Sequence, residues 1–148
     1  MIRIFRVAAL AATTCAVAIP ASAGAASARA EIEFEKTFDP AATIANGAPT
    51  WRGTASGDAV GTVESKLLAF SETGTVSQLD AEWTVTAGQR SFKARVSGIY
   101  NSSSQIIVLN GVVTEGWMKG AQIHERGVRP DPNVSQYIGT LTLVGGGR

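Results

Sequence analysis

One histidine carries the most obvious capacity for proton transfer in this sequence. His124 is the only histidine, and histidine is the side-chain type whose ordinary charge change lies nearest to neutral pH. It shares strand parity with Gln122 and Arg126, which is typical of a solvated face. It has neither a cysteine partner nor a carboxylate at a spacing known from zinc sites or activated nucleophiles. The sequence therefore predicts no metal site and no cofactor.

Two carboxylates offer a second route to acid–base chemistry. Asp80 and Glu82 alternate along one polar strand face, so they would form an acid–base pair if that face lined an interior. Such alternation is more typical of a face in contact with water. No catalytic residue is assigned on this basis, and whether the protein is an enzyme stays open.

Large aromatic side chains are the strongest candidates for ligand contact. Trp51, Trp83, Tyr100 and Trp117 are rigid and partly polar, which suits them to hold a flat or polyene molecule. The alternative is that they fill the core of a small barrel. Asn110 lies in an otherwise apolar segment, where its amide needs partners from a ligand or from neighbouring backbone. These five residues are the predicted ligand-binding set.

The first thirty residues have the features of a secretory signal. Arg3 and Arg6 precede the apolar run 7–19, and small-residue cleavage patterns end at Ala23, Ala28 and Ala30. The apolar run is shorter than the ~20 residues that a membrane-spanning helix needs. The sequence therefore predicts a signal peptide over residues 1–30, cleaved after Ala28 or Ala30, and a secreted or periplasmic protein with no membrane span after cleavage.

The remaining segment, residues 31–148, is long enough for a single domain. It contains no cysteine, because Cys15 lies in the predicted signal, so ordinary packing must stabilise it. Its 10 basic and 12 acidic residues give a formal charge of −2 and are scattered singly. A nucleic-acid partner is not indicated, since such proteins normally carry a basic patch or stripe.

Most of this segment alternates between apolar and polar residues, which predicts antiparallel strands with one wet face. Lys36 is the exception on the apolar face of the first strand. The segment 106–114 is apolar on both faces, so we expect it to be covered on both sides, by lumen packing within and by protein cover or a subunit contact outside. Seven or eight strands are expected, with glycines at bends or bulges, and the predicted fold is all-β, a small closed antiparallel barrel of about eight strands. The expected strands are 31–38, one near Trp51, 60–70, 79–86, 92–100, 106–114, 117–126 and 137–144.

Four segments carry a resemblance to a known family. The sequence WRGTA at 51–55, the expected hairpin that ends with 92–101, NGVVTEGWMKGAQIHE at 110–125 and GTLTL at 139–143 together resemble the allene oxide cyclase barrel-like superfamily, which includes dirigent proteins and bacterial spirotetronate-type cyclases. The resemblance implies an eight-stranded barrel, often dimeric or trimeric, that holds a hydrophobic ligand. Plant allene oxide cyclases carry a Glu and an Asn on the first strand and a Ser-Pro pair near its end. Here EIEFEKTFDP has no Asn and no Ser before Pro40, so the resemblance implies no catalytic residue.

Together these observations favour a secreted barrel that binds an apolar or aromatic small molecule in its lumen, with or without cyclase- or isomerase-type steering. The alternative is a non-catalytic, oligomeric interaction module, which the two-sided apolar segment 106–114 favours. A homo-oligomer, dimer or trimer, is expected in either case.

Overall fold

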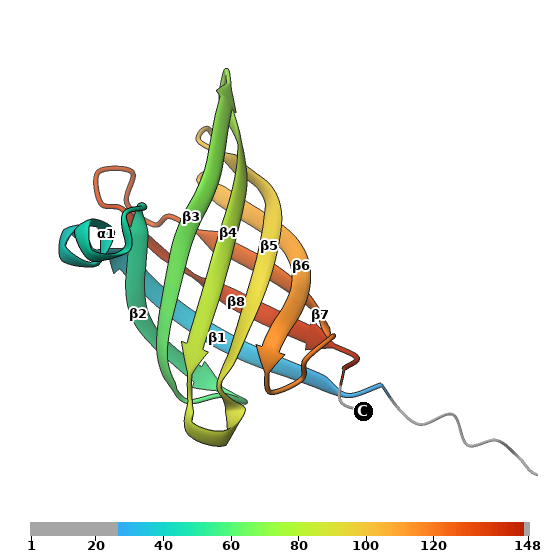
Figure 1. The fold of residues 1–148 in the computed structure, drawn as a ribbon. Coiled ribbons are helices and arrows are strands. Elements are labelled where there is room, and N and C mark those ends of the chain that lie inside the picture. Colours follow the sequence, from blue (N-terminus) through green and yellow to red (C-terminus); the bar gives the residue numbers. More distant parts are fainter. Residues whose placement is uncertain (1–26, 147–148) are drawn as a thin grey trace, which may run out of the picture.

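Eight antiparallel strands close into a barrel in which each strand pairs with its neighbours in the sequence and β1 pairs with β8 (Figure 1). The computed structural model describes residues 27–146. The predicted all-β fold is confirmed, as an eight-stranded closed antiparallel barrel with one short helix. The strands are β1 (Arg29–Phe38), β2 (Thr50–Gly57), β3 (Gly61–Thr73), β4 (Val76–Thr86), β5 (Phe92–Asn101), β6 (Ile106–Gly116), β7 (Gln122–Val128) and β8 (Gln136–Val144), with helix α1 (Pro40–Asn46) and the 3₁₀ turn η1 (Gly88–Arg90).

The alternating sequence places one row of side chains from each strand in the lumen. On β1 the buried row is Ala30, Ile32, Phe34 and Lys36, and the residues between them are exposed. Lys36 therefore continues an apolar row into the interior, because a residue two positions from Phe34 must share its face.

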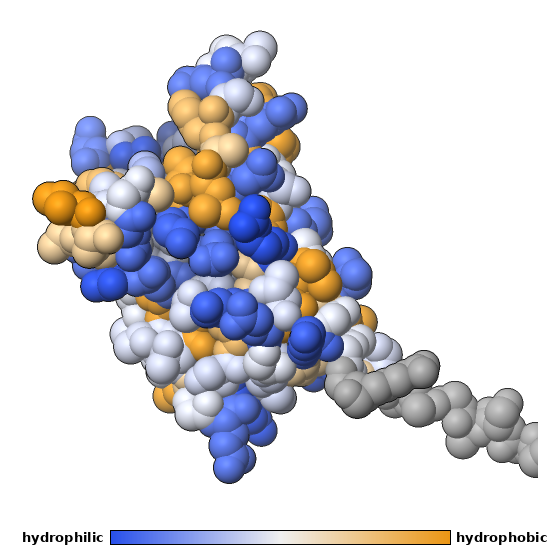
Figure 2. Space-filling model, viewed as in Figure 1, coloured by the Kyte–Doolittle hydropathy of each residue, from blue (hydrophilic) through white to orange (hydrophobic). Residues whose placement is uncertain are grey.

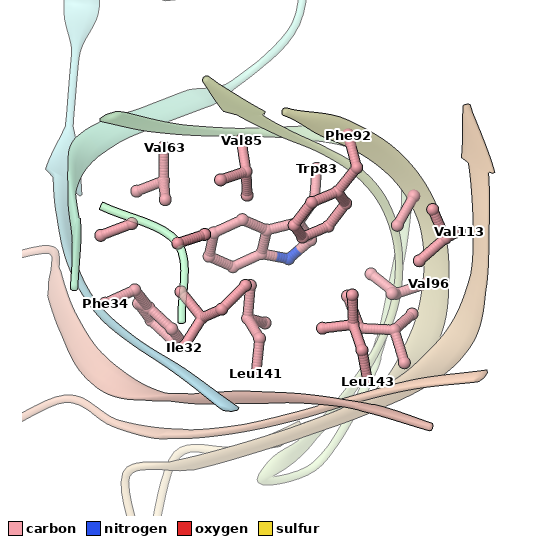
Figure 3. Close-up of a cluster of buried hydrophobic side chains, with 14 of the residues drawn as sticks. Ile32, Phe34, Val63, Trp83, Val85, Phe92, Val96, Val113, Leu141 and Leu143 are labelled. Atoms are coloured by element: carbon pink, nitrogen blue, oxygen red, sulfur yellow. The ribbon is translucent and has the colours of Figure 1, made fainter. Parts of the chain in front are cut away.

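Trp83 is the centre of a closely packed half of the barrel. Its side chain is 0% exposed, and its ring meets that of Phe34 edge to face with centroids 5.0 Å apart. Figure 3 shows its indole surrounded by aliphatic side chains from several strands, including Ile32, Val85 and Leu141. Apolar surface buried in this way is the main stabilising contribution available to a domain without a disulfide.

At the other end of the barrel the β3–β4 hairpin extends beyond the neighbouring strands (Figure 1). A bulge there shifts the β3–β4 register between Leu67 and Ala69, so that Phe70 pairs with Leu79. The extra residue moves Phe70 to the side that faces the lumen, because side-chain direction alternates along a strand. The extension and its bulge thus give one wall of the barrel additional apolar surface near the opening.

Glycines allow the backbone to bend sharply where the strands pass close to one another. A Cβ atom on Gly111 of β6 would lie 1.8 Å from the carbonyl oxygen of Arg95 on β5, and one on Gly53 of β2 would lie 1.7 Å from that of Glu35 on β1. Only glycine fits such contacts, which explains the glycines in strand-like sequence. The nearby register shift between Lys93 and Ala94 is a bulge of the kind expected from those glycines.

Helix α1 was not predicted from the sequence. Asp39 caps it by accepting a hydrogen bond from the backbone N–H of Ala42 at 2.9 Å, and Pro40 occupies its first turn. The helix lies beside β2, where the Thr43 hydroxyl accepts a hydrogen bond from the Thr50 N–H at 2.9 Å. It carries Ile44, which is 84% exposed, and Figure 2 shows apolar surface at the edge of the molecule where α1 lies.

One further strand prediction needs correction, and one is tested only in part. The outer face of β6 is exposed within residues 27–146, since Asn110 and Val112 are exposed there, Val112 at 38%, so the expected cover by a subunit contact stays a prediction. Trp117 does not begin a strand: β6 continues to Gly116, a turn follows, and β7 begins at Gln122. The predicted strand 117–126 is right over residues 122–126 but begins five residues too early, because Trp117 and Met118 are apolar although they lie in the turn.

The predicted signal peptide lies mostly outside the described residues, as does Cys15. Within them, β1 begins at Arg29, two residues before the expected start at Glu31, and Ala30 is buried in the lumen row. Cleavage after Ala28 would leave β1 whole, whereas cleavage after Ala30 would remove its first two residues. No helix within residues 27–146 is long and apolar enough to cross a membrane.

Candidate functional site

A cavity of about 270 Å³ occupies the end of the barrel beside the β3–β4 extension. Its walls are predominantly apolar, and its lining includes exposed residues of the hairpin and of the β5–β6 turn, so the opening lies at this end. The aromatic part of the wall consists of Trp51, Phe70, Tyr100 and Tyr137, and the aliphatic part of Leu67, Leu79, Ala81, Ile107 and Leu109.

The inner end of the cavity is polar. Lys36 and Ser65 both line it, although they are only 3% and 4% exposed. The Lys36 ammonium donates to the Ser65 hydroxyl at 3.2 Å and to Oε1 of Glu125 at 3.0 Å. Glu125, which is 0% exposed, also accepts from the indole N–H of Trp83 through Oε2 at 2.7 Å. These four residues form the buried polar cluster referred to below.

The cluster joins the cavity to the packed half of the barrel. Trp83 contributes its ring face as well as its N–H, since the Lys36 Nζ lies 4.0 Å from the indole ring centroid. A lysine over an aromatic ring gains from the ring's electron-rich face, and more so when water is excluded. Both carboxylate oxygens of Glu125 and the Lys36 nitrogen are thus held by protein groups on four different strands.

Burial lowers the pKa of the Lys36 ammonium from its ordinary 10.5, because removing water disfavours the charged form. The negative charge of Glu125 and the hydrogen bond to it act in the opposite direction and offset part of this effect. The amine therefore loses its proton more readily than a surface lysine does, and Oε1 of Glu125 lies 3.0 Å from it.

Tyr137 at the cavity wall is also perturbed. Burial, followed by the nearby Tyr100, raises the pKa of its phenol from 10.0 to about 12. Its ring meets those of Trp51 and Tyr100 edge to face, with centroid distances of 6.4 and 5.9 Å. The Tyr100 hydroxyl in turn donates to the Gln105 side chain at 2.9 Å, which fixes the second tyrosine.

The Tyr137 shift predicts a specific alkaline behaviour. Between about pH 10 and about pH 12 the phenol ionises in the unfolded chain but stays neutral in the fold, so the free energy of unfolding should fall as pH rises through this window. Tyr137→Phe removes this contribution. Urea unfolding at several pH values measures the free energy of unfolding of the wild type minus that of the variant. This difference should be constant below about pH 10 and should decrease between about pH 10 and about pH 12. A difference that does not change with pH would contradict this assignment.

The structure places the five predicted ligand-binding residues in four environments. Trp51 and Tyr100 line the cavity together. Trp83 lies beneath it, fully buried, and contacts it only through Lys36. Trp117 lies at the opposite end of the barrel, half-buried against Phe92.

Asn110 lies on the outer face of β6, so it does not line the cavity. Its Oδ1 is 2.7 Å from Nδ1 of His124 on β7, and both side chains are exposed. His124 thus occupies the solvated face that its strand parity predicted. Asp80 and Glu82 also point outward, and Glu82 pairs with Lys66 at 3.3 Å.

Sequence reasoning missed the buried polar cluster as a unit. Lys36 interrupts the apolar row of the first strand, but that pattern did not identify its ion-pair partner. A signal for Glu125 existed: if Gln122, His124 and Arg126 face water, the alternate residues Ile123 and Glu125 must face the lumen. Within residues 27–146 the structure shows no cluster of three or more metal-ligating side chains.

Comparison of the sequence with protein-family models and with curated proteins gave no match. The geometry of the barrel and of its cavity therefore carries the functional argument.

Proposed function

We propose that this protein is an exported barrel that binds a compact apolar or aromatic small molecule in its lumen. The cavity beside the β3–β4 extension carries the proposal, because it combines apolar walls with a few fixed polar groups at its inner end. This is the usual composition of a small-molecule site. Its volume of about 270 Å³ is just below the common range of about 300–1,000 Å³, which favours a ligand of one or two rings or a short polyene.

The aromatic wall supports the same ligand class. Trp51, Tyr100 and Tyr137 meet edge to face and present large rigid surfaces, so a flat ligand can pack on them with little loss of side-chain entropy. The indole N–H of Trp51 already donates to the Ser135 hydroxyl at 3.0 Å, which holds this ring at the rim.

The eight-stranded barrel is also compatible with the resemblance to the allene oxide cyclase barrel-like superfamily, and we extend the proposal to cyclase- or isomerase-type steering. Catalysis of that kind needs a polar group to stabilise developing charge in an otherwise apolar cavity. Lys36, Ser65 and Tyr137 are such groups, since each lines the cavity and is largely buried. None of them corresponds to the carboxylate and amide of the plant enzymes.

One observation favours the alternative, an oligomeric interaction module. On the outer face, Ile106 of β6 pairs in register with Val128 of β7, which pairs with Ile138 of β8. Val128 and Ile138 are 38% and 40% exposed, so three adjacent strands present a short apolar row to solvent. A second copy of the chain would cover such a row.

The proposed function is tested by native mass spectrometry of protein purified from its own source, followed by the cavity variant Ala81→Phe. Ala81 points into the cavity, so a phenyl ring there occupies the ligand space, and we expect the variant to lose the co-purifying small molecule. Gln78→Phe is the matched control, because Gln78 is exposed and outward-facing on the same strand. Retention of the molecule by Ala81→Phe would contradict the proposed site, and an empty oligomer would favour the interaction module.

A further inference from the structure

We propose that Lys36 binds an aldehyde or ketone ligand covalently, as an imine between its Nζ and the carbonyl carbon. The inference rests on the proposed function, since it assigns a reactive group to the same cavity. It names the ligand class more closely: a compact aromatic or polyene molecule that ends in a carbonyl group.

The position of Lys36 carries the first step of the argument. Its side chain is 3% exposed, yet it lines the inner end of an apolar cavity that leads to the barrel mouth. A ligand that packs along Trp51 and Tyr100 therefore directs its far end toward the Lys36 nitrogen. A desolvated lysine in a hydrophobic pocket is the arrangement in which an amine becomes nucleophilic at neutral pH.

Glu125 supplies the second step, because imine formation requires proton transfers. Its Oε1 is 3.0 Å from the Lys36 Nζ and accepts a proton from the ammonium, which leaves the nitrogen lone pair free to attack the carbonyl carbon. The C–N bond forms as the C=O π bond opens, and one proton moves from the nitrogen to the alkoxide oxygen, giving a carbinolamine. Glu125 returns its proton to the departing hydroxyl, water leaves, and the C=N bond forms. One lysine ammonium and one carbonyl thus give one protonated imine and one water, with Glu125 again a carboxylate and with no oxidant or reductant.

The surroundings of Lys36 also suit the product. A protonated imine keeps the positive charge of the ammonium at the same nitrogen, so Glu125 remains its counter-ion. The Trp83 ring, 4.0 Å from Nζ, favours a delocalised cation at this place. Trp83 and Ser65 hold Glu125 and Lys36 respectively by hydrogen bonds, which keeps the nitrogen aimed without further rearrangement.

The test is reductive trapping with cinnamaldehyde, an aromatic aldehyde small enough for the cavity. The full chain is incubated with the aldehyde and then with borohydride, which reduces an imine to a stable secondary amine. Intact mass should rise by one aldehyde less one oxygen atom, and peptide mapping should place the label on Lys36. Label confined to the exposed Lys93 and Lys119, with none on Lys36, would overturn the inference.

Ala81→Phe keeps Lys36 and Glu125 but fills the cavity, so it should lose the Lys36 label while the label on Lys93 stays unchanged. An undiminished Lys36 label in this variant would contradict access through the cavity. Gln78→Phe again serves as control and should retain the label. Lys36→Arg removes the reactive amine but keeps the positive charge beside Glu125. It therefore tests directly whether the amine at position 36 carries the label. A cooperative thermal transition of this variant is the evidence that it folds.

Cinnamyl alcohol separates this inference from the proposed function. It has the same ring and chain but no carbonyl carbon, so it should bind reversibly in the cavity and leave no covalent label. Binding of the alcohol without any Lys36 label from the aldehyde would overturn only the covalent step. If neither compound bound to the wild type or to Ala81→Phe, the proposed ligand class would be contradicted as well.

Discussion

Replacing Glu125 by glutamine is expected to lower the free energy of unfolding by about 3–5 kcal/mol, because it leaves the Lys36 charge buried without its counter-charge. Glutamine keeps nearly the same shape and can still accept a hydrogen bond from the Trp83 indole, so the loss reports on charge rather than on packing. Lys36 is 3% exposed, so little water contacts its charge directly. Urea unfolding at neutral pH, followed by tryptophan fluorescence, measures the effect.

The matched control is Glu82→Gln on the outer face. Glu82 pairs with Lys66 at 3.3 Å, but both side chains are 30% exposed. Partly solvated pairs of this kind contribute only about 0–1 kcal/mol. The double variant Lys36→Met, Glu125→Gln removes both charges and should recover much of the stability that Glu125→Gln loses. If the double variant were less stable than the wild type by the sum of the losses that Lys36→Met and Glu125→Gln cause singly, the two residues would not act as a pair.

Replacing Trp83 by alanine is expected to destabilise the barrel by about 3–5 kcal/mol, the usual cost of removing a fully buried large aromatic side chain. Three contributions coincide at this residue: its contacts with Phe34, its hydrogen bond to Glu125 and its ring beneath Lys36. The substitution also opens the floor of the cavity toward the packed half. Chemical denaturation monitored by circular dichroism measures the change without relying on the tryptophan signal.

Trp117→Ala is the comparison for Trp83. Trp117 is half-buried at the opposite end of the barrel and packs on Phe92 with the Arg90 guanidinium 5.3 Å from its ring centroid. Its loss should cost clearly less, because part of its surface is already in water. Equal destabilisation by the two substitutions would contradict the central role assigned to Trp83.

Alternation of apolar and polar residues predicted the strands of the barrel. It identified the inward-facing row of each strand, because a strand with one face in water alternates apolar and polar residues with a period of two. The glycines predicted bends where strands approach one another closely. The same rule placed His124 in solvent. Helix α1 was not predicted, because seven residues are too few to show a clear helical period. Asp39 and Pro40 are nevertheless residues typical of a helix start.

The candidate site was predicted in part. Trp51 and Tyr100 line the cavity, but aromatic residues alone do not reveal which end of a barrel is packed and which is open. The open end is set by the bulged β3–β4 extension, which lengthens one side of the barrel wall. The bulge is a feature of strand register, and composition does not reveal it. The pairing of Lys36 with Glu125 joins β1 to β7 across the lumen, and residues so far apart in the sequence are brought together only by barrel closure.

The most direct test of the ligand-binding cavity is titration of the protein with cinnamyl alcohol, followed by two-dimensional amide NMR spectra. We expect saturable shifts at the cavity end, over Trp51, Leu79, Tyr100 and Tyr137, and none at Phe92 or Trp117 at the opposite end. Ala81→Phe should abolish these shifts. Shifts that concentrate on the outer face of β6 to β8, or that persist in Ala81→Phe, would contradict a ligand site in the lumen.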